Sequence, residues 1–339
     1  MSPIAAVLAE AREEIATLTR GLGRRVDIAS LGVTDRTGEL SLGPPGRLVS
    51  PNGACRLFRA ADGWMALNLA REEDKGLVAA WLECEPAADP WRLVAAQAAQ
   101  WSSDALRERA RLLGLPACRV GEVRDVDREP PSGNPDRAGR SARARPRVID
   151  LSVLWAGPLC GCILAAMGAD VLRIDSARRP DPSRISTPGF FDRLNGAKRE
   201  LRLDLASAGG QAWLRDLVLD ADVVITSARR RGLASIGLDP ETILAARPGL
   251  IWVAVTGYGL ADDRVAFGDD AAAAGGLVGW TPAGQPGFLG DALADPVTGL
   301  AAAAGALRAL ESGGGVLLDC AMARQSAAAA ATCGRQVFA

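Results

Sequence analysis

The side chains able to carry out covalent chemistry in this 339-residue sequence are carboxylates, amines and thiols, because the chain contains no histidine. Imidazole is the usual base near neutral pH and the commonest ligand of catalytic zinc. Its absence excludes Ser-His-Asp and Cys-His mechanisms and the HExxH metal site. The chemistry that remains uses an acidic side chain, a lysine, a cysteine or the backbone, and we expect no metal site.

Phosphate binding is the second chemistry that the spacing of residues suggests. The turn Ala156-Gly157-Pro158 lies between a strand-like run and a helical pattern, and Asp175 ends the next strand about 20 residues later, as in a dinucleotide-binding fingerprint. Gly157 and Gly161 are separated by a stretch that contains Pro158, so GxGxxG is absent and a nicotinamide cofactor is disfavoured. A helix N-terminus at this turn can still hold a nucleotide phosphate through its N–H groups.

A further pair of cations occurs in residues 195–205, where Lys198 and Arg199 precede an alternating strand pattern. As a functional feature, the pair would meet a phosphate or the ribose of an adenine nucleotide. As a structural feature, it would form the charged edge of a hairpin. The residues by themselves leave both interpretations open.

The elements that must position these groups alternate between strand and helix after residue 147, which predicts a parallel sheet. The expected strands are 147–151, 169–175, 221–226, 250–256 and 316–319, and the expected helices are 159–167, 207–219, 240–246 and 299–311. An open parallel sheet binds ligands beyond the carboxyl ends of its strands. Four loops should therefore line the site, namely 152–160, 176–200, 227–236 and 257–298.

The chain before residue 125 favours a smaller α+β domain. Strand-like runs at 55–60 and 64–70 flank a glycine-containing connection and predict a hairpin. Helical patterns occupy residues 5–19, 75–83 and 90–113. Residues 125–147 are rich in Pro, Gly and Arg, which favours a solvated linker over a phosphate-binding patch. The expected fold is α/β, with a small α+β domain at 1–124, a linker at 125–146 and a Rossmann-like open parallel sheet at 147–339.

Composition is that of an ordinary globular protein. The net charge of −1 provides no field that would attract nucleic acid or an anionic membrane. No run is long and apolar enough to span a bilayer, and residues 1–20 are typical of an amphipathic helix rather than a signal peptide. The seven cysteines are scattered, and the closest pair, Cys160 and Cys162, is too close for a CxxC motif. We therefore expect a cytoplasmic protein with reduced thiols.

Several short stretches occur in an order and spacing that carry a resemblance. They are Val148-Ile149-Asp150-Leu151-Ser152, Ala156-Gly157-Pro158, Gly168-Ala169-Asp170-Val171, Asn195-Gly196-Ala197-Lys198-Arg199, Ala221-Asp222-Val223-Val224, Ile236-Gly237-Leu238, Thr256-Gly257-Tyr258-Gly259 and Ala294-Asp295-Pro296-Val297-Thr298-Gly299. From residue 148 to about 331 the chain resembles the amino-terminal half of the family III (CaiB/BaiF) CoA-transferases. That group includes carnitine CoA-transferase and formyl-CoA transferase, with α-methylacyl-CoA racemase as a relative.

Residues 50–123 resemble the same family's small domain and the segment after it. Asp62-Gly63-Trp64-Met65-Ala66-Leu67 fits the hairpin, and Leu113-Gly114-Leu115-Pro116-Ala117 fits a later loop. In the usual family order these segments follow the large domain, whereas here they precede it. The chain therefore resembles a circularly permuted member or a piece of a tandem of two modules.

The resemblance implies a nucleophilic aspartate four residues before a glycine that opens a helix, and Asp295 with Gly299 fits that position. Asp291 is the competing carboxylate, and a simple helix-capping role for Asp295 is the structural alternative. The implied chemistry is attack of the carboxylate on an acyl-CoA thioester, an aspartyl anhydride and then an aspartyl thioester. Coenzyme A and acyl-CoA are expected as substrates, with no permanently bound cofactor.

The resemblance also implies CoA contacts along the loops of the large domain. The expected contact residues are Val153, Leu154, Ala156, Gly157, Pro158, Asn195, Lys198, Arg199, Arg229, Arg230, Gly257, Tyr258 and Arg264. The expected partners are an acyl-CoA and a small carboxylic acid, a second copy of the chain in a homodimer, and alternatively a complementary CoA-transferase subunit. Nucleic acid and membrane are not expected partners.

Two departures from the family pattern keep alternative functions open. The glycine-rich loop that shields the intermediates corresponds to residues 48–53, which contain only Gly53, so hydrolysis of acyl-CoA stays an alternative. The racemase relative has a Gly-His-Asp triplet where this chain has Gly268-Asp269-Asp270, so epimerisation would need a pair of carboxylates. A non-catalytic CoA-binding subunit is the third alternative, and transfer of CoA is the expected function.

Overall fold

The computed structural model describes residues 2–124 and 145–338, and the chain divides into two compact units. Unit 1 comprises residues 1–39, 127–263 and 296–321, and unit 2 comprises residues 40–126, 264–295 and 322–339. Each unit is therefore assembled from three segments of the chain. The sequence had instead predicted that each domain is one continuous segment, 1–124 and 147–339. Residues 125–144 of the predicted linker lie outside the described residues.

Unit 1 is built on a six-stranded parallel sheet with the order β6-β5-β4-β7-β8-β11. The strands are β4 (Arg147–Asp150), β5 (Asp170–Ser176), β6 (Arg199–Leu203), β7 (Val223–Thr226), β8 (Ile251–Thr256) and β11 (Val316–Ala321). Numbered along the chain, this order is 3-2-1-4-5-6, the doubly wound arrangement whose strand order reverses between β4 and β7. The expected Rossmann-like α/β fold is therefore confirmed.

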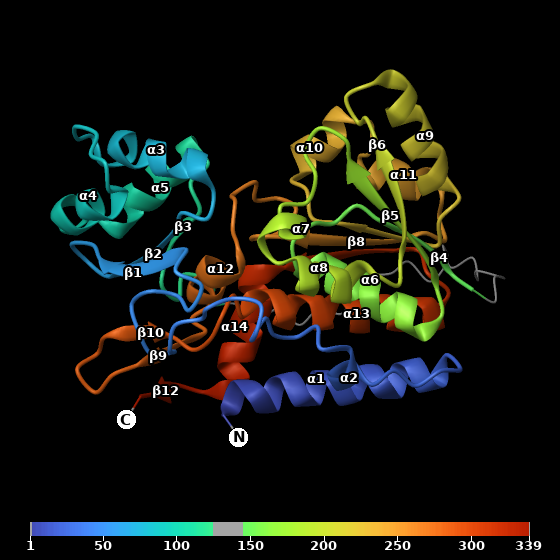
Figure 1. The fold of residues 1–339 in the computed structure, drawn as a ribbon, viewed down its shortest axis with the longest axis horizontal. Coiled ribbons are helices and arrows are strands. Elements are labelled where there is room, and N and C mark those ends of the chain that lie inside the picture. Colours follow the sequence, from blue (N-terminus) through green and yellow to red (C-terminus); the bar gives the residue numbers. More distant parts are fainter. Residues whose placement is uncertain (1, 125–144, 339) are drawn as a thin grey trace. The chain divides into compact units, whose positions relative to one another are not determined.

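Helices cover both faces of this sheet (Figure 1). The helices of unit 1 are α1 (Pro3–Gly21), α2 (Ile28–Leu31), α6 (Ala156–Met167), α7 (Ser183–Ser186), α8 (Pro188–Asn195), α9 (Ala208–Leu219), α10 (Arg230–Ser235), α11 (Pro240–Ala246) and α13 (Ala294–Ser312), whose first two residues belong to unit 2. Apolar residues of α9 and α11 pack with the central strands in one core that encloses Trp252. On the other face α6 packs against β4, β5 and β7.

Unit 2 contains two small sheets. The antiparallel sheet β1-β2-β3 consists of β1 (Cys55–Arg59), β2 (Trp64–Asn68) and β3 (Ala117–Arg119), which confirms the predicted hairpin. The second sheet consists of β9 (Val278–Trp280), β10 (Pro286–Phe288) and β12 (Gln336–Val337). The helices are α3 (Glu72–Leu82), α4 (Pro90–Gln97), the 3-10 helix η1 (Ala98–Gln100), α5 (Ser103–Leu113), α12 (Gly268–Ala274) and α14 (Met322–Cys333).

Packing in unit 2 depends on one large side chain, Trp81, and on one residue without a side chain, Gly275. Trp81 of α3 is fully buried among apolar residues of the first sheet and α5, and its indole N–H donates to the carbonyl of Leu106. Helix α12 packs closely against α14 because Gly275 carries no Cβ, and an added Cβ would lie 2.5 Å from the backbone nitrogen of Ala327. No helix in the described ranges of the chain is long and apolar enough to cross a membrane.

Several predicted helix boundaries were wrong. The helix expected at 90–113 is interrupted at Trp101, because Ser102 caps a new helix through its side-chain oxygen. Helix α3 begins earlier than expected, at Glu72. Two more helices also begin early, α6 at Ala156 and α13 at Ala294. Their first turns contain Pro158 and Pro296, and proline is tolerated there because the first N–H groups of a helix have no partner within it.

Candidate active site

Asp295 lies in the first turn of α13, one helical turn before Gly299. Its backbone N–H donates to the carbonyl of Ala292 at 2.9 Å, which closes the turn that precedes the helix. Its half-buried carboxylate rests directly against the backbone of Gly268, since a Cβ added there would lie 2.1 Å from Oδ2 of Asp295. Only glycine at position 268 therefore allows the carboxylate to take this place.

Asp269 is buried beside this turn and accepts hydrogen bonds on both oxygens. The backbone N–H of Ala292 donates to Oδ1 at 2.8 Å, and Nδ2 of Asn52 donates to Oδ2 at 2.7 Å. The same Nδ2 donates to Oδ1 of Asp291 at 2.7 Å. Burial raises the pKa of Asp269 to about 6; the hydrogen bond from Asn52 opposes the rise and the charge of Asp291 adds to it.

Asp270 is fully buried one residue later. Its Oδ1 accepts from the backbone N–H of Phe267 at 3.0 Å and from Nδ2 of Asn68 at 3.1 Å, while Oδ2 has no hydrogen-bond partner in the described residues. Burial raises the pKa of Asp270 well above its ordinary value, and it also raises the pKa of the nearby Cys55 and Cys118 thiols. Thiols held in the neutral form are poor nucleophiles, so the reactive groups of this region are carboxylates.

In unit 1 the structure brings together the predicted residues that follow β4 and β7. The backbone N–H of Val153 donates to Oγ of Ser227 at 3.0 Å, which joins the two loops at the point where the strand order reverses. Leu154 has a positive φ of 69°, and its N–H donates to Asp181. A Cβ on Gly157 would lie 2.3 Å from the Ser152 side chain. The turn is therefore held tightly at the place where doubly wound sheets bind their ligands.

Lys198 and Asn195 are placed differently from the expected phosphate contacts. The Nζ of Lys198 is buried and donates to Oδ2 of Asp150 at 2.8 Å, to the carbonyl of Pro158 at 2.9 Å and to Oδ1 of Asn195 at 2.9 Å. An ammonium group has three donors, and these bonds use all of them. Lys198 therefore supports the 156–158 turn from inside unit 1.

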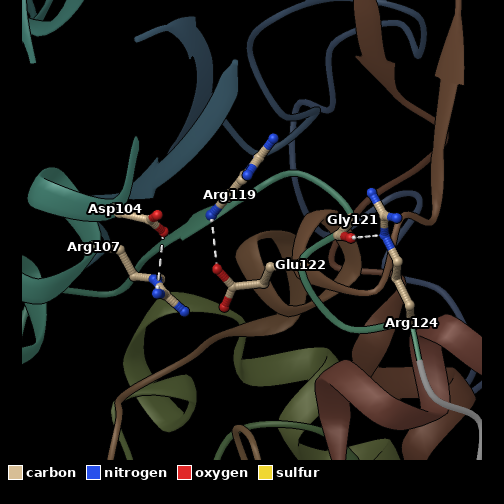
Figure 2. A pocket seen from close by; sticks show the side chains of 6 residues that line it. All are labelled: Asp104, Arg107, Arg119, Gly121, Glu122 and Arg124. Atoms are coloured by element: carbon tan, nitrogen blue, oxygen red, sulfur yellow. Dashed lines mark hydrogen bonds and ion pairs between the residues drawn. The ribbon is translucent and has the colours of Figure 1, made fainter. Parts of the chain in front are cut away.

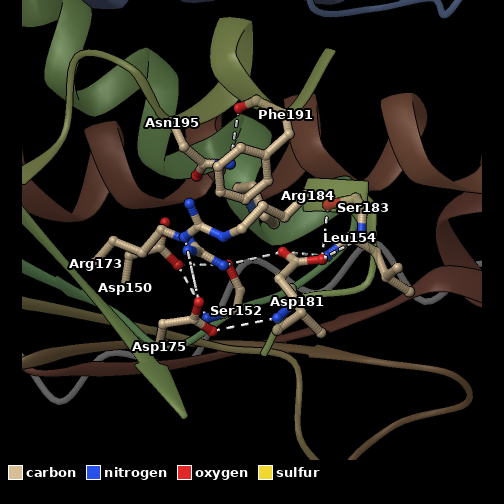
Figure 3. Close-up of polar contacts among 12 residues, drawn as sticks. Asp150, Ser152, Leu154, Arg173, Asp175, Asp181, Ser183, Arg184, Phe191 and Asn195 are labelled. Carbon is tan, nitrogen blue, oxygen red and sulfur yellow. Dashed lines mark hydrogen bonds and ion pairs between the residues drawn. The ribbon is translucent and has the colours of Figure 1, made fainter. Parts of the chain in front are cut away.

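Asp175 takes part in a second buried network (Figure 3). Arg173 lies over the ring of Phe191, its NH2 donates to Oδ2 of Asp181 at 3.0 Å, and its NH1 is 3.6 Å from Asp175. Arg184 pairs with Asp175 from the other side at 3.3 Å. Because Asp175 is 1% exposed and enclosed by these partners, it is not placed to bind a nucleotide ribose. This arrangement disfavours the nicotinamide alternative further.

The remaining predicted cations are partly engaged in ion pairs. Arg199 pairs with Asp170 at the amino end of β5, so the structure does not bring its guanidinium to the carboxyl edge. Arg230 pairs with Asp239 on the surface. Arg229 lies at the exposed N-terminal end of α10. Gly257 and Tyr258 directly follow β8, and Tyr258 is buried.

Arg264 belongs to unit 2, where its NH1 lies 2.6 Å from Oε1 of Glu122. Glu122 lines a hollow of about 270 Å³ that also contains Arg107, Arg119 and Arg124 (Figure 2). The Arg264 side chain is 15% exposed and that of Glu122 is 8% exposed, so the ion pair lies largely beneath the surface. The predicted phosphate contact of Arg264 would require this pair to open.

Sequence reasoning missed Asn52 and assigned Asp269 no part in holding Asp295. Asn52 lies 217 residues before Asp269, and no local pattern signals that the two side chains meet. The Pro51-Asn52-Gly53 turn was the available signal, because a single glycine replaces the glycine-rich loop that the resemblance led us to expect.

Comparisons with known proteins find relatives that are named as CoA-transferases. The succinate–glutarate CoA-transferase of Agrobacterium fabrum is 35% identical over 198 residues, which are 52% of this chain and 50% of that protein. The succinyl-CoA–L-malate CoA-transferase beta subunit of Chloroflexus aurantiacus is 33% identical over 193 residues, 52% of this chain and 48% of that protein. The chain thus spans about half the length of the curated relatives it matches.

Structural comparison leads to the same group. The crystal structure of a CAIB/BAIF family protein from Brucella suis matches with a TM-score of 0.50 and 28% identity, over 59% of this chain and 56% of that chain. The resemblance noted from the sequence motifs is therefore confirmed. Since residues 145–336, more than half of the chain, match the family described as CoA-transferase family III, this protein belongs to that family.

Proposed function

We propose that this protein is a CoA-transferase that moves CoA from an acyl-CoA thioester to a carboxylic acid, with Asp295 as the nucleophile. The observation that carries the proposal is the half-buried carboxylate of Asp295, held against Gly268 at the start of α13 in a chain of this family. The names of the relatives, both CoA-transferases, support the reaction class. The absence of histidine is compatible with it, because a carboxylate can attack without a base.

The proposed reaction conserves the thioester's energy. An oxygen of Asp295 attacks the thioester carbonyl carbon, the C–S bond breaks, and CoA leaves as thiolate from a mixed anhydride. The thiolate then attacks the aspartyl carbonyl, which releases the acyl group as a carboxylate and leaves an aspartyl-CoA thioester. The acceptor carboxylate attacks this thioester to form a second anhydride, and return of CoA thiolate to the acceptor's carbonyl regenerates Asp295. Exclusion of water protects each intermediate.

For the CoA half of the reaction, we propose the carboxyl edge of the unit 1 sheet as the binding surface. The backbone of residues 153–158, Arg229 and the 257–258 turn are the groups placed there. Lys198 and Asn195 would act indirectly by holding the 156–158 turn in place. Arg229 supplies the exposed positive charge that a phosphate would need.

We also propose that the protein acts as an oligomer, either with a complementary subunit or as a homodimer. A relative named as a beta subunit is compatible with a complementary subunit, and a homodimer is the other arrangement we expect. The permuted order of the segments likewise stays a prediction.

Transfer is favoured over epimerisation by the environment of Asp269. A second base would need an accessible oxygen, but Asp269 is 3% exposed, and its oxygens accept from Ala292 and Asn52. Incubation of a 2-methylacyl-CoA in deuterated water tests this directly, and we expect no deuterium at the α-carbon. Exchange at that position faster than CoA transfer would favour the epimerase.

The proposal is tested by intact-protein mass spectrometry after incubation with succinyl-CoA or glutaryl-CoA, followed by hydroxylamine. We expect hydroxylamine-sensitive modification of the wild-type chain, located at residue 295 by peptide mapping. Asp295→Ala should abolish the modification, and Asp291→Ala should retain it. Modification that persists in Asp295→Ala, or none in the wild type while labelled CoA still binds, would overturn the proposal.

A further inference from the structure

We propose that Asn52 is a positioning residue for the nucleophile: its side-chain amide joins Asp269 to Asp291 and thereby holds the turn that presents Asp295. This inference rests on the proposed role of Asp295. It assigns a purpose to the loop at residues 50–53, which replaces a glycine-rich segment with a turn tied to the carboxylates.

The orientation of the Asn52 amide is determined by its neighbours. Its Oδ1 accepts from Oγ of Ser50 at 3.0 Å and from the backbone N–H of Ala54 at 2.9 Å. Its Nδ2 faces two carboxylate oxygens, one from Asp269 and one from Asp291, each at 2.7 Å. Rotating the amide by 180° would place an oxygen against two carboxylates, so only one orientation satisfies every group.

A continuous series of hydrogen bonds leads from Asn52 to Asp295. Asn52 donates to Asp269, whose other oxygen accepts from the backbone of Ala292, whose carbonyl accepts from the backbone of Asp295. Ala292 has a positive φ of 45°, a conformation that costs free energy for a residue with a Cβ and persists only when its surroundings hold it. The hydrogen bond that the backbone N–H of Ala292 donates to Asp269 supplies that restraint, three residues before the nucleophile.

The charges around Asp269 make the network sensitive to protonation. Asp291 adds a like charge to it, Asp270 and Cys55 of β1 lie near it, and the Asn52 amide is the neutral side chain that donates to it. An ionised carboxylate accepts from both Asn52 and Ala292. A protonated one has lost its negative charge and accepts more weakly from both, so its hold on Ala292 and Asn52 loosens. The acid side of the pH profile of Asp295 acylation should therefore report the ionisation of Asp269, whose pKa is about 6.

Substitutions of Asn52 and Asp291 should shift the acid limb of the pH profile of acylation in opposite directions. Asn52→Ala removes the hydrogen bond that lowers the pKa of Asp269, so the acid limb should move to higher pH and acylation at pH 7 should fall about tenfold. Asp291→Ala removes a like charge that raises this pKa, so the acid limb should move to lower pH. A mere loss of folding stability would not produce opposite shifts.

A rescue variant tests the geometry. In Asn52→Asp/Asp269→Asn/Asp291→Asn the donors and acceptors are exchanged, so the carboxylate at 52 accepts from both new amides. We expect this triple variant to recover most of the acylation rate that Asn52→Asp alone loses. Asn68→Ala removes a buried amide that contacts Asp270 instead, and it should lower stability without moving the acid limb.

A readout without substrate separates this inference from the proposed function. In hydrogen–deuterium exchange, Asn52→Ala should speed exchange of the amides of residues 290–295 at least tenfold, whereas Asn68→Ala should not. If the wild type is never acylated but this exchange result holds, the proposed function fails and the positioning role of Asn52 stands. Unchanged exchange in Asn52→Ala, or shifts of the same sign in Asn52→Ala and Asp291→Ala, would overturn the inference.

Discussion

The β4–β5 region of unit 1 and the start of α12 in unit 2 bury carboxylates in opposite ways. In unit 1 each buried carboxylate of the β4 and β5 region lies beside a cation: Asp150 beside Lys198, and Asp175 and Asp181 beside Arg173 (Figure 3). In unit 2, Asp269 and Asp270 are held by side-chain amides and backbone N–H groups, and no ion pair to either is seen in the described residues. The pKa of both unit 2 carboxyls is raised by burial.

A buried carboxylate has a different effect when its partner is a cation than when its partners are neutral donors. A carboxylate neutralised by a neighbouring cation holds segments together, and removing one partner leaves the other charge exposed to a medium of low polarity. A carboxylate held by neutral donors keeps a raised pKa, and it can direct a turn while changing its protonation near physiological pH. The comparison predicts that substitutions in the β4–β5 region chiefly lower stability, whereas those around Asp269 chiefly lower the rate of acylation.

The largest effect is expected for Asp295→Asn, which keeps the shape of the side chain and removes the nucleophile. Exchange of labelled CoA into acyl-CoA should fall at least about a thousandfold, because the covalent route is lost. The free energy of unfolding, measured with urea, should change by less than about 1 kcal/mol, since the side chain is only half-buried. A variant that kept a tenth of the exchange rate would contradict the assignment.

Lys198→Met should give the largest loss of stability. Both members of the Lys198–Asp150 pair have fully buried side chains, and breaking such a pair by removing one partner costs about 3–5 kcal/mol. Urea or thermal unfolding measures the loss. Lys198→Met/Asp150→Asn leaves no uncompensated charge and should recover part of it. A single variant as stable as the wild type would show that the pair is not needed to hold the turn.

The raised pKa of Asp269 should appear in the pH dependence of folding. Its ordinary value is near 3.8 and its folded value about 6, so the folded state binds more protons between these values. The resulting stabilisation is complete below about pH 4 and is lost as the pH rises through 6, on the order of 2–3 kcal/mol. Asp269→Asn should carry a constant cost at every pH and lack this component. Identical pH dependence of unfolding in the two proteins would contradict the assignment.

The smallest effects on acylation are expected for alanine substitutions at two glycines of unit 2, Gly268 and Gly76. Gly268→Ala places a Cβ 2.1 Å from Oδ2 of Asp295, so acylation should fall about tenfold as the carboxylate is displaced. Gly76→Ala lies in the middle of α3 with no atom within 4 Å of the new Cβ, so it should stabilise the protein by about 0.5–1 kcal/mol and leave acylation unchanged. Equal acylation rates in the two variants would show that Gly268 is not needed for close approach.

Most of the strand and helix order was predictable because it follows from local patterns. The buried run Val223–Thr226 and the glycine at 168 that ends α6 signal their elements within a few residues. Helix starts were harder to place, since Pro158 and Pro296 interrupt the pattern but are accommodated in a first turn. The paired roles of Arg173 and Lys198 were not predictable, because a cation before or within a strand looks the same whether it faces solvent or a buried carboxylate.

The sequence by itself determined the alternation of strand and helix, the family resemblance, and the choice of a carboxylate over imidazole chemistry. Each depends on residue types, periods and spacings within short stretches. Only the tertiary structure decided which cations are enclosed and which side chains surround Asp295. Asn52 meets Asp269 and Asp291 across 217 and 239 residues, and that meeting depends on how the three segments of unit 2 pack. A hydrogen bond between such distant residues leaves no local pattern, because the residues next to each partner in the sequence do not depend on whether that bond forms.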